Sequence, residues 1–128
     1  MIKLEFNHGL LFTTIKIKYR GKSKELSNIL IDTGAAETII TPDIVEDIGL
    51  IVEREDIINA FYGVGGSLHS FFSKQVDEVV IDQIVLPGFK VDFGLVDPKG
   101  SINGLLGLDI LTEIGAIIDL KKMEMRMS

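Results

Sequence analysis

A single acidic residue on a glycine turn is the feature of this sequence with the clearest chemical meaning. Asp32-Thr33-Gly34 follows the apolar run 29–31, so a carboxylate stands where a buried strand is expected to end. A carboxylate that activates water for amide hydrolysis needs an acidic partner, because one group must be ionised while the other is protonated. The motif occurs once in 128 residues. We therefore expect the partner to be Asp32 of a second copy of the chain.

Two glycine-containing segments follow this turn along the chain. Tyr62-Gly63-Val64-Gly65-Gly66 is flanked by apolar stretches, which predicts a β-hairpin whose tip needs positive φ angles. The stretch lacks the Lys and Ser/Thr of a phosphate-binding loop. Leu105-Leu106-Gly107 is a second apolar turn and precedes a short helical pattern. We expect it to belong to the core more than to a binding surface.

The elements that must position these segments are mostly strands. Ile15, Ile17 and Tyr19 alternate with polar residues, which is the period-2 pattern of a half-buried strand. Further strands are predicted at 25–31, 57–62, 68–73, 76–82, 84–86 with 89–96, 115–120 and 122–127.

Two short helices interrupt the strands. Thr41 is a good N-cap, Pro42 suits the first helical position, and Gly49 can end the helix. The second helix is predicted over 109–114 and ends at Gly115.

The two helical segments are alike in sequence. Residues 42–50 and 108–116 share Asp, Ile, Ile and Gly at matching places, and each segment follows a glycine turn after an apolar stretch. We interpret this as a pseudo-two-fold within the chain, built twice from a strand, a loop and a helix. Chance similarity between short helices is the alternative. Only the first copy carries a carboxylate in its turn.

Composition bounds the class of protein. One domain spanning residues 1–128 is expected, and a hydrophobic fraction of 46% is enough for a core. The net charge of −6, without a basic stripe, argues against nucleic-acid binding. No apolar run approaches the roughly 18 residues that cross a bilayer, and residues 1–5 do not resemble a signal peptide. We therefore expect a soluble, cytoplasmic protein without membrane attachment.

Metal and other nucleophile chemistries find little support. The chain has no cysteine, which excludes disulfides, thiolate metal sites and a cysteine nucleophile. His8 and His69 have no partner at i+4, so no metal site and no cofactor are expected. Ser67 and Ser70 lie in no Gly-x-Ser-x-Gly elbow.

In their order and spacing, the three segments resemble the retropepsin-like aspartic proteases, the single-domain dimeric relatives of pepsin. That family combines an Asp-Thr/Ser-Gly-Ala turn, a glycine-rich flap hairpin and a later apolar-apolar-Gly before a short helix. The resemblance covers about residues 10 to 120. It implies an all-β fold, namely a closed acid-protease-type β-barrel with one or two short helices. It also implies an aspartic endopeptidase that acts as a homodimer on a peptide or protein.

The resemblance also implies roles for individual residues. Asp32 of each chain would share a proton with its mate and activate water, while Gly34 lets the two turns approach and Thr33 bonds across the dimer. Thr38 would be structural. The expected substrate contacts are Ala35, Gly63, Val64, Gly65 and Gly66, and the candidates for apolar side-chain pockets are Ile29, Ile31, Ala35, Val64 and Ile102.

The sequence departs from the retroviral pattern at two positions. Ala36 and Leu108 stand where an acid and an Arg are usual, so the ion pair of those residues is missing at these sites. Glu37 is a candidate for a substrate-facing role instead. Asp109 and Asp119 are better explained by a helix start and a strand end than as a second catalytic carboxylate.

Two other readings stay open. One is a non-catalytic module of the same fold that binds a peptide or dimerises without cleaving. The other is a monomer in which Asp32 has no partner and is inactive.

Overall fold

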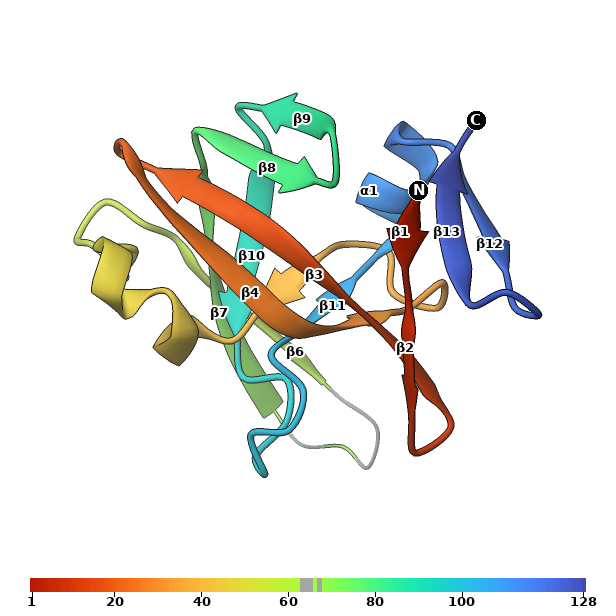
Figure 1. Cartoon of the computed structure of the whole chain (residues 1–128). Helices are drawn as coiled ribbons and strands as arrows, with labels where there is room; N and C mark the ends of the chain where they lie inside the picture. The colour runs from red at the N-terminus through yellow and green to blue at the C-terminus, as the bar shows by residue number, and fades with distance from the viewer. Residues whose placement is uncertain (63–65, 67) are drawn as a thin grey trace.

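The chain folds mostly into β-strands that form two sheets (Figure 1). The computed structural model describes residues 1–62, 66 and 68–128. The larger sheet has the strand order β6-β7-β10-β5-β11-β4-β3-β8-β9, with β2 paired to β3, and the smaller sheet has the order β1-β13-β12. The strands are β1 (Ile2–Lys3), β2 (Glu5–Asn7), β3 (Leu10–Tyr19), β4 (Lys22–Ile31), β5 (Ile39–Ile40), β6 (Ile58–Tyr62), β7 (Leu68–Gln75), β8 (Glu78–Ile81), β9 (Ile84–Pro87), β10 (Lys90–Gly94), β11 (Gly104–Leu106), β12 (Ala116–Asp119) and β13 (Glu124–Met127).

The larger sheet curls into a half-barrel around the core, which confirms the expected all-β fold class. Its centre is the long hairpin of β3 and β4, each ten residues long, with a register shift between Thr13 and Ile15. Such an irregularity bends a strand and increases its twist. The curled sheet therefore wraps its apolar face inward.

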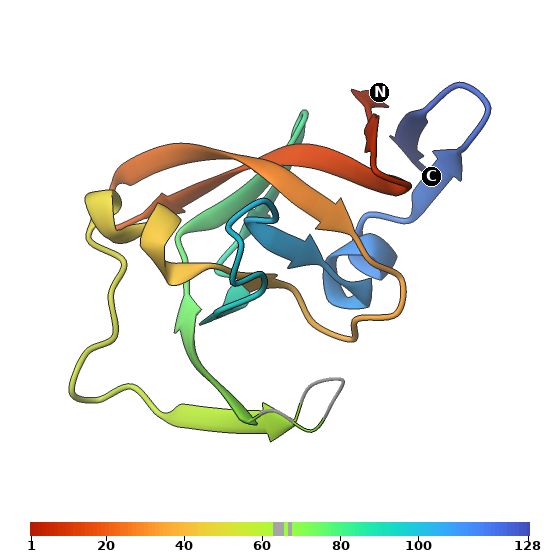
Figure 2. The same cartoon turned by 90° about the horizontal axis from the view of Figure 1, so that it is seen from below.

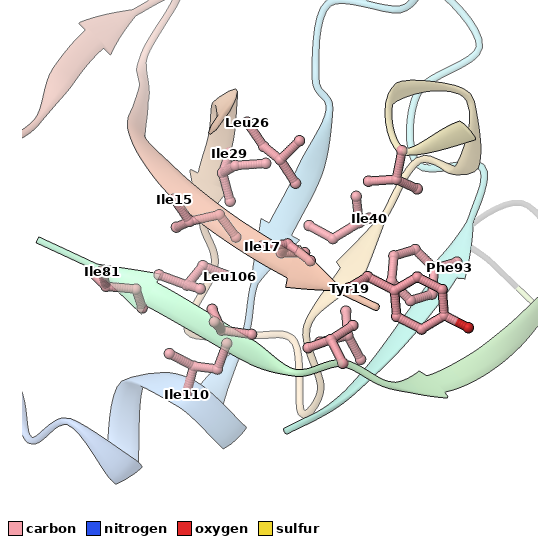
Figure 3. Packing of buried hydrophobic residues seen from close by; sticks show 14 of the residues in the cluster. Ile15, Ile17, Tyr19, Leu26, Ile29, Ile40, Ile81, Phe93, Leu106 and Ile110 are labelled. Atoms are coloured by element: carbon pink, nitrogen blue, oxygen red, sulfur yellow. The ribbon is translucent and has the colours of Figure 1, made fainter. Parts of the chain in front are cut away.

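The core is built from the alternating apolar residues of these strands. Side chains of β3, β4, β5, β10, β11 and α1 (Leu108–Glu113) converge inside the half-barrel (Figure 3). Phe72 of β7 stacks on Phe93 of β10 with ring centroids 5.5 Å apart. Fully buried members include Ile17, Ile29, Ile40, Val45, Leu50, Val79, Ile81, Phe93, Leu106, Ile110 and Met125.

The first predicted helix is two short 3₁₀ turns, η1 (Pro42–Ile44) and η2 (Glu46–Ile48). Thr41 makes no side-chain cap, and its backbone N–H donates to Asn103 O at 2.9 Å. Thr41 does occupy the N-cap position, with Pro42 in the first turn, as expected, but the side-chain cap is absent and its Oγ1 is buried with no hydrogen-bond partner among the described residues. The predicted end at Gly49 is correct, since Gly49 adopts a left-handed φ of 79°.

The pseudo-two-fold is visible in the pairing of β4 with β11. These strands run parallel, with Leu105 opposite Leu30 and Leu106 opposite Ile31. Each is followed by a turn, and a short helical segment comes after it, at η1–η2 in one copy and at α1 in the other. Gly115, like Gly49, has a positive φ just after its helical segment. The repeat in the sequence thus corresponds to a repeat in the fold.

The two ends of the chain meet in the smaller sheet. β1 pairs with β13 and β13 pairs with β12, so the termini lie near each other (Figure 1). Strands β1, β2, β5 and β11 were not expected from the sequence. They have only two or three residues each, too few to show a period, and pairing with longer neighbours defines them.

Four charged side chains, here called the Lys74 cluster, join the segment before β6 to β7 and to the β3–β4 turn. Lys74 Nζ lies 2.5 Å from Glu53 Oε1 and 2.6 Å from Asp56 Oδ2. Arg20 donates to both carboxylate oxygens of Glu53, at 2.8 and 3.2 Å. Hydrogen bonds lower the pKa of Glu53 from 4.5 to about 2, and the bond from Arg20 contributes more than the bond from Lys74.

Acid should weaken the fold in a pH window set by Glu53. Because its pKa is lower in the folded chain, its stabilisation is complete above pH 4.5 and is lost as the pH falls through about 2. The Glu53→Gln variant should have a lower urea midpoint at pH 7 than the parent and a smaller further loss between pH 4.5 and 2. Urea unfolding followed by circular dichroism checks this. Equal losses in both proteins over that window would contradict the assignment.

Candidate active site

Asp32 sits at the end of β4 in a turn that its own carboxylate closes. Asp32 Oδ1 accepts a hydrogen bond from Gly34 N at 2.9 Å, and Ala35 N donates to Asp32 O at 3.2 Å. The side chain of Asp32 is half-buried, whereas Thr33 and Gly34 are exposed. The turn therefore fixes the carboxylate and leaves its outer backbone accessible to a partner.

The second copy of the repeat holds the turn from behind. Asp32 N donates to Leu106 O at 3.0 Å, Leu108 N to Ala35 O at 2.8 Å, and Asp109 N to Ala36 O at 3.1 Å. This packing requires glycine at position 107. A Cβ there would lie 2.7 Å from the carbonyl carbon of Glu37 and 2.9 Å from Ala35 O. The expectation that the 105–107 segment is core agrees with the burial of Leu106 and Gly107.

Thr38 and Asp109 form a hydrogen-bonded link between the two copies, here called the Thr38–Asp109 brace. The carboxylate of Asp109 accepts from Thr38 N at 3.0 Å, from Thr38 Oγ1 at 2.7 Å and from Ile110 N at 2.8 Å. Thr38 Oγ1 in turn accepts from Gly107 N at 3.0 Å. Thr38 is completely buried, so these bonds replace water that cannot reach its polar atoms. Thr38 is therefore structural, as the sequence predicted.

The two other candidate carboxylates, Asp109 and Asp119, accept hydrogen bonds from residues outside the Asp32-Thr33-Gly34 turn. Asp109 belongs to the brace, and Asp119 accepts hydrogen bonds from Lys121 N and Lys122 N in the turn after β12. Asp119 therefore has the local role that the sequence favoured. Asp109 lies in the first turn of α1, as expected, but its carboxylate also binds Thr38, 71 positions away.

The two residues that depart from the retroviral pattern, Ala36 and Leu108, leave no charged side chain without a partner. Ala36 and Leu108 place no ionisable group behind the turn, and both are exposed. Glu37 forms an ion pair with Lys90 at 3.4 Å, and Lys90 also lies 3.2 Å from Asp92. Both Glu37 and Lys90 are largely exposed, which makes this a weak pair. The proposed substrate-facing role of Glu37 must therefore compete with Lys90.

A cavity of about 360 Å³ lies between the β2–β3 hairpin and the loop before β11. Its walls come from Asn7, His8, Leu10, Phe12, Asn28, Ser101 and Ile102. Ile102 lines this cavity, but its expected contact with a substrate side chain stays a prediction. Ile29 is completely buried, so the expectation that it lines a pocket is wrong. No motif in the sequence indicated that His8 or Asn28 would line this cavity. Their positive φ angles of 51° and 55° are a backbone signal that only the structure contains.

Asp97 organises the loop that forms one wall of this cavity. Its carboxylate accepts from Ser101 Oγ at 2.6 Å and from the backbone N–H groups of Lys99, Ser101 and Ile102 at 3.0–3.2 Å. The Ser101 hydroxyl, followed by these backbone donors, lowers the pKa of Asp97. The cavity wall is therefore held by an ionised carboxylate.

The predicted flap hairpin corresponds to β6 and β7, which pair from Ile58–Phe72 to Tyr62–Leu68. It projects from the half-barrel as an arm (Figure 2). Gly66 is exposed and has a φ of 82°, in keeping with a glycine turn. Gly63, Val64 and Gly65 lie outside the described residues, so their expected contact with substrate stays a prediction.

The part of the chain that the structure describes contains no group of three or more His, Asp or Glu side chains able to hold a metal ion. In the same residues, no helix is long and apolar enough to cross a membrane.

Comparison with known proteins identifies the family. Residues 15–110 match the sequence model of the family described as aspartyl protease. The chain belongs to the aspartyl protease family. A search of curated proteins gives no match for the sequence.

Solved structures of retropepsin-like proteins share the fold of this aspartyl protease family member. A retropepsin-like aspartic protease from Rickettsia conorii superposes with a TM-score of 0.67 at 20% identity, covering 93% of this chain and 92% of that one. The retroviral protease-like domain of Ddi1 from Leishmania major gives 0.62 at 19% identity, with 93% and 88% covered. The EIAV protease, solved with the inhibitor HBY-793, gives 0.59 at 22% identity, with 85% and 91% covered. The retropepsin-like fold that the resemblance implied is thereby confirmed.

Removing the acceptor from the Thr38–Asp109 brace should destabilise this family member. Asp109→Leu leaves the buried donors of Thr38 without an acceptor, which costs about 1–3 kcal/mol for each group. Asp109→Asn keeps one acceptor oxygen and should cost less. Urea unfolding checks both variants, with Asp43→Leu on the exposed face of η1 as a control expected to change stability by about 0.5 kcal/mol or less. An Asp109→Leu protein as stable as the parent would contradict the role of the brace.

Proposed function

We propose that this chain is an aspartic endopeptidase that acts as a homodimer, with Asp32 of each copy forming the catalytic pair. The observation that carries the proposal is the geometry of Asp32. Its half-buried carboxylate accepts a hydrogen bond from Gly34 N, and the backbone of its turn bonds to the 106–109 segment. The Thr33-Gly34 backbone beside it is exposed, so a second copy could approach it. Membership of the aspartyl protease family supports the same chemistry.

The mechanism follows from placing two such carboxylates side by side. Two carboxyl groups in contact do not both ionise, because their like charges repel, so the pair holds one proton between them. The ionised carboxylate takes a proton from a water molecule as that water attacks the scissile carbonyl carbon. The protonated carboxylate donates its proton to the carbonyl oxygen. The tetrahedral intermediate then collapses: the carboxyl group that took the water proton gives it to the amide nitrogen, which leaves, and the other carboxylate takes back a hydroxyl proton. No covalent bond to the enzyme forms.

The substrate would be an extended peptide. Its backbone would pair between the catalytic turns and the β6–β7 hairpins in the manner of an added strand. Ala35 and the residues Gly63–Gly66 are the proposed backbone contacts, and apolar side chains around the cleaved bond are expected. A single domain over residues 1–128 and a cytoplasmic location stay predictions from the sequence.

Cleavage of an unfolded protein substrate tests the proposal. The parent should cleave an unstructured protein at acidic to neutral pH. Asp32→Asn should abolish cleavage, because neither side chain of the pair is then a carboxyl group that can take up or give a proton. Asp119→Asn, whose carboxylate only orders a surface turn, is the matched control and should keep the activity.

The dimer adds a second expectation to this experiment. Specific activity should rise with enzyme concentration over the range in which sedimentation detects association. A protein that sediments as a dimer yet cleaves nothing across this pH range would favour the non-catalytic binding module. Cleavage that persists in Asp32→Asn would contradict the assignment of the catalytic residue.

A further inference from the structure

The base of the β6–β7 hairpin is tied to the half-barrel by a nearly buried lysine. The side chain of Lys74 on β7 is 6% exposed, and its ammonium group contacts the carboxylates of Glu53 and Asp56. Both acids lie in the segment that leads into β6. The Lys74 side chain therefore joins the strand by which the chain leaves the hairpin to the segment by which the chain enters it.

The cluster is itself fixed to the half-barrel. Arg20, in the β3–β4 turn, grips Glu53 with two hydrogen bonds, and its guanidinium lies 4.9 Å from the centre of the Tyr19 ring. Tyr19 is buried in the core. The segment carrying the acids is also closed, since Glu53 N donates to Asp56 Oδ2 at 2.7 Å and Asp56 N to Glu53 O at 3.0 Å. The hairpin root thus connects to the longest strands of the fold.

Beyond its root, the described part of the hairpin has little support of its own. Ile58 and Leu68 are 65% and 64% exposed, and Asn59, Ala60 and Ser70 are exposed as well. The last core contact along β7 toward the tip is Phe72, stacked on Phe93. Figure 2 shows the hairpin leaving the body as an arm. The arm is attached by the ladder of β7 with β10, which extends to Phe71, by Phe72 and by the Lys74 cluster. The ladder holds β7, whereas the Lys74 cluster also holds the segment that leads into β6.

Burial makes the Lys74 cluster more effective than the surface pairs of this chain. Lys24 and Asp47 form a pair at 2.7 Å, yet both remain in contact with solvent. Such pairs contribute little, because water screens them. Removing Lys74 would instead leave Asp56, whose side chain is 12% exposed, without its cation. Uncompensated buried charge is strongly unfavourable, so the segment before β6 would have to move to solvate its acids.

We propose that Lys74 is a positioning residue, which, with Glu53 and Asp56, fixes the angle at which the β6–β7 hairpin leaves the half-barrel. In the proposed protease this angle decides how the hairpin lies over a bound peptide. That consequence rests on the proposed function, whereas the anchoring itself does not.

Hydrogen exchange measured by NMR on the whole chain tests the anchoring without reference to activity. In Lys74→Met, the described amides of β6 and β7 should exchange at least tenfold faster than in the parent, while those of β4 and β11 keep their rates. Lys24→Met is the matched control: it removes a lysine from a surface pair and should leave the hairpin amides unchanged.

A second variant separates positioning from overall stability. Lys74→Met combined with Glu53→Gln and Asp56→Asn removes the uncompensated charge, so the urea midpoint should recover toward the parent value. The hairpin amides should still exchange fast, because the link to Arg20 and Lys74 is gone. This variant also serves if Lys74→Met alone does not fold. Slow hairpin exchange in the triple variant, or equal acceleration across all strands, would overturn the proposal.

Peptide cleavage distinguishes a failure of the anchor from a failure of the proposed function. If the parent cleaves, the triple variant should raise KM severalfold with kcat nearly unchanged, because the Asp32 turn is held by separate hydrogen bonds. An unchanged KM would overturn the positioning role. Loose hairpin amides in the variants with no cleavage by the parent would uphold the anchor and remove the proposed protease function.

Discussion

The structure depends on one hydrogen-bonded contact between its two half-repeats, the Thr38–Asp109 brace. The carboxylate of Asp109 accepts hydrogen bonds from the backbone N–H and the hydroxyl of Thr38, and Thr38 Oγ1 accepts one from Gly107 N. Because Thr38 is buried, its donors cannot bond to water and depend on Asp109, so the position of the loop 32–38 is coupled to that of α1 and β11. Asp32 is thus positioned by atoms that are remote in sequence, and a half-exposed turn can still hold a carboxylate in a defined place.

The same brace explains why the departures from the retroviral pattern are tolerated. Elsewhere in the family an acid and an arginine are usual at the positions held here by Ala36 and Leu108. In this chain the backbone groups of residues 35, 36, 108 and 109 bond directly to one another, and the carboxylate of Asp109 accepts hydrogen bonds from three uncharged donors. Losing both members of a pair leaves no charge unpaired. The turn is therefore supported by neutral donors where an ion pair is missing.

Local pattern was enough to predict the elements that carry their own signal. The alternation around Ile15 and Ile17 marked β3, and Asp32-Thr33-Gly34 marked the turn at the end of β4. The two-residue β5 could not be found this way, because it exists through pairing with β10 and β11. Thr41 stands at the predicted N-cap position, but its hydroxyl is buried and makes no cap, which the local pattern could not show. The partners of Glu37, Lys74 and Asp109 are likewise long-range, and no window of sequence contains them.

In the proposed dimer, each chain supplies Asp32 on a hydrogen-bonded turn, and the second acid of the pair comes from the other copy. The most direct measurement of that claim is the separation of the two Asp32 carboxylates in a crystal structure of the assembled dimer with a hydroxyl-bearing peptide inhibitor. The account predicts carboxylate oxygens about 3 Å apart, sharing a proton beside the inhibitor hydroxyl. A dimer in which the two Asp32 side chains face different surfaces, too far apart to bind one water molecule, would contradict it.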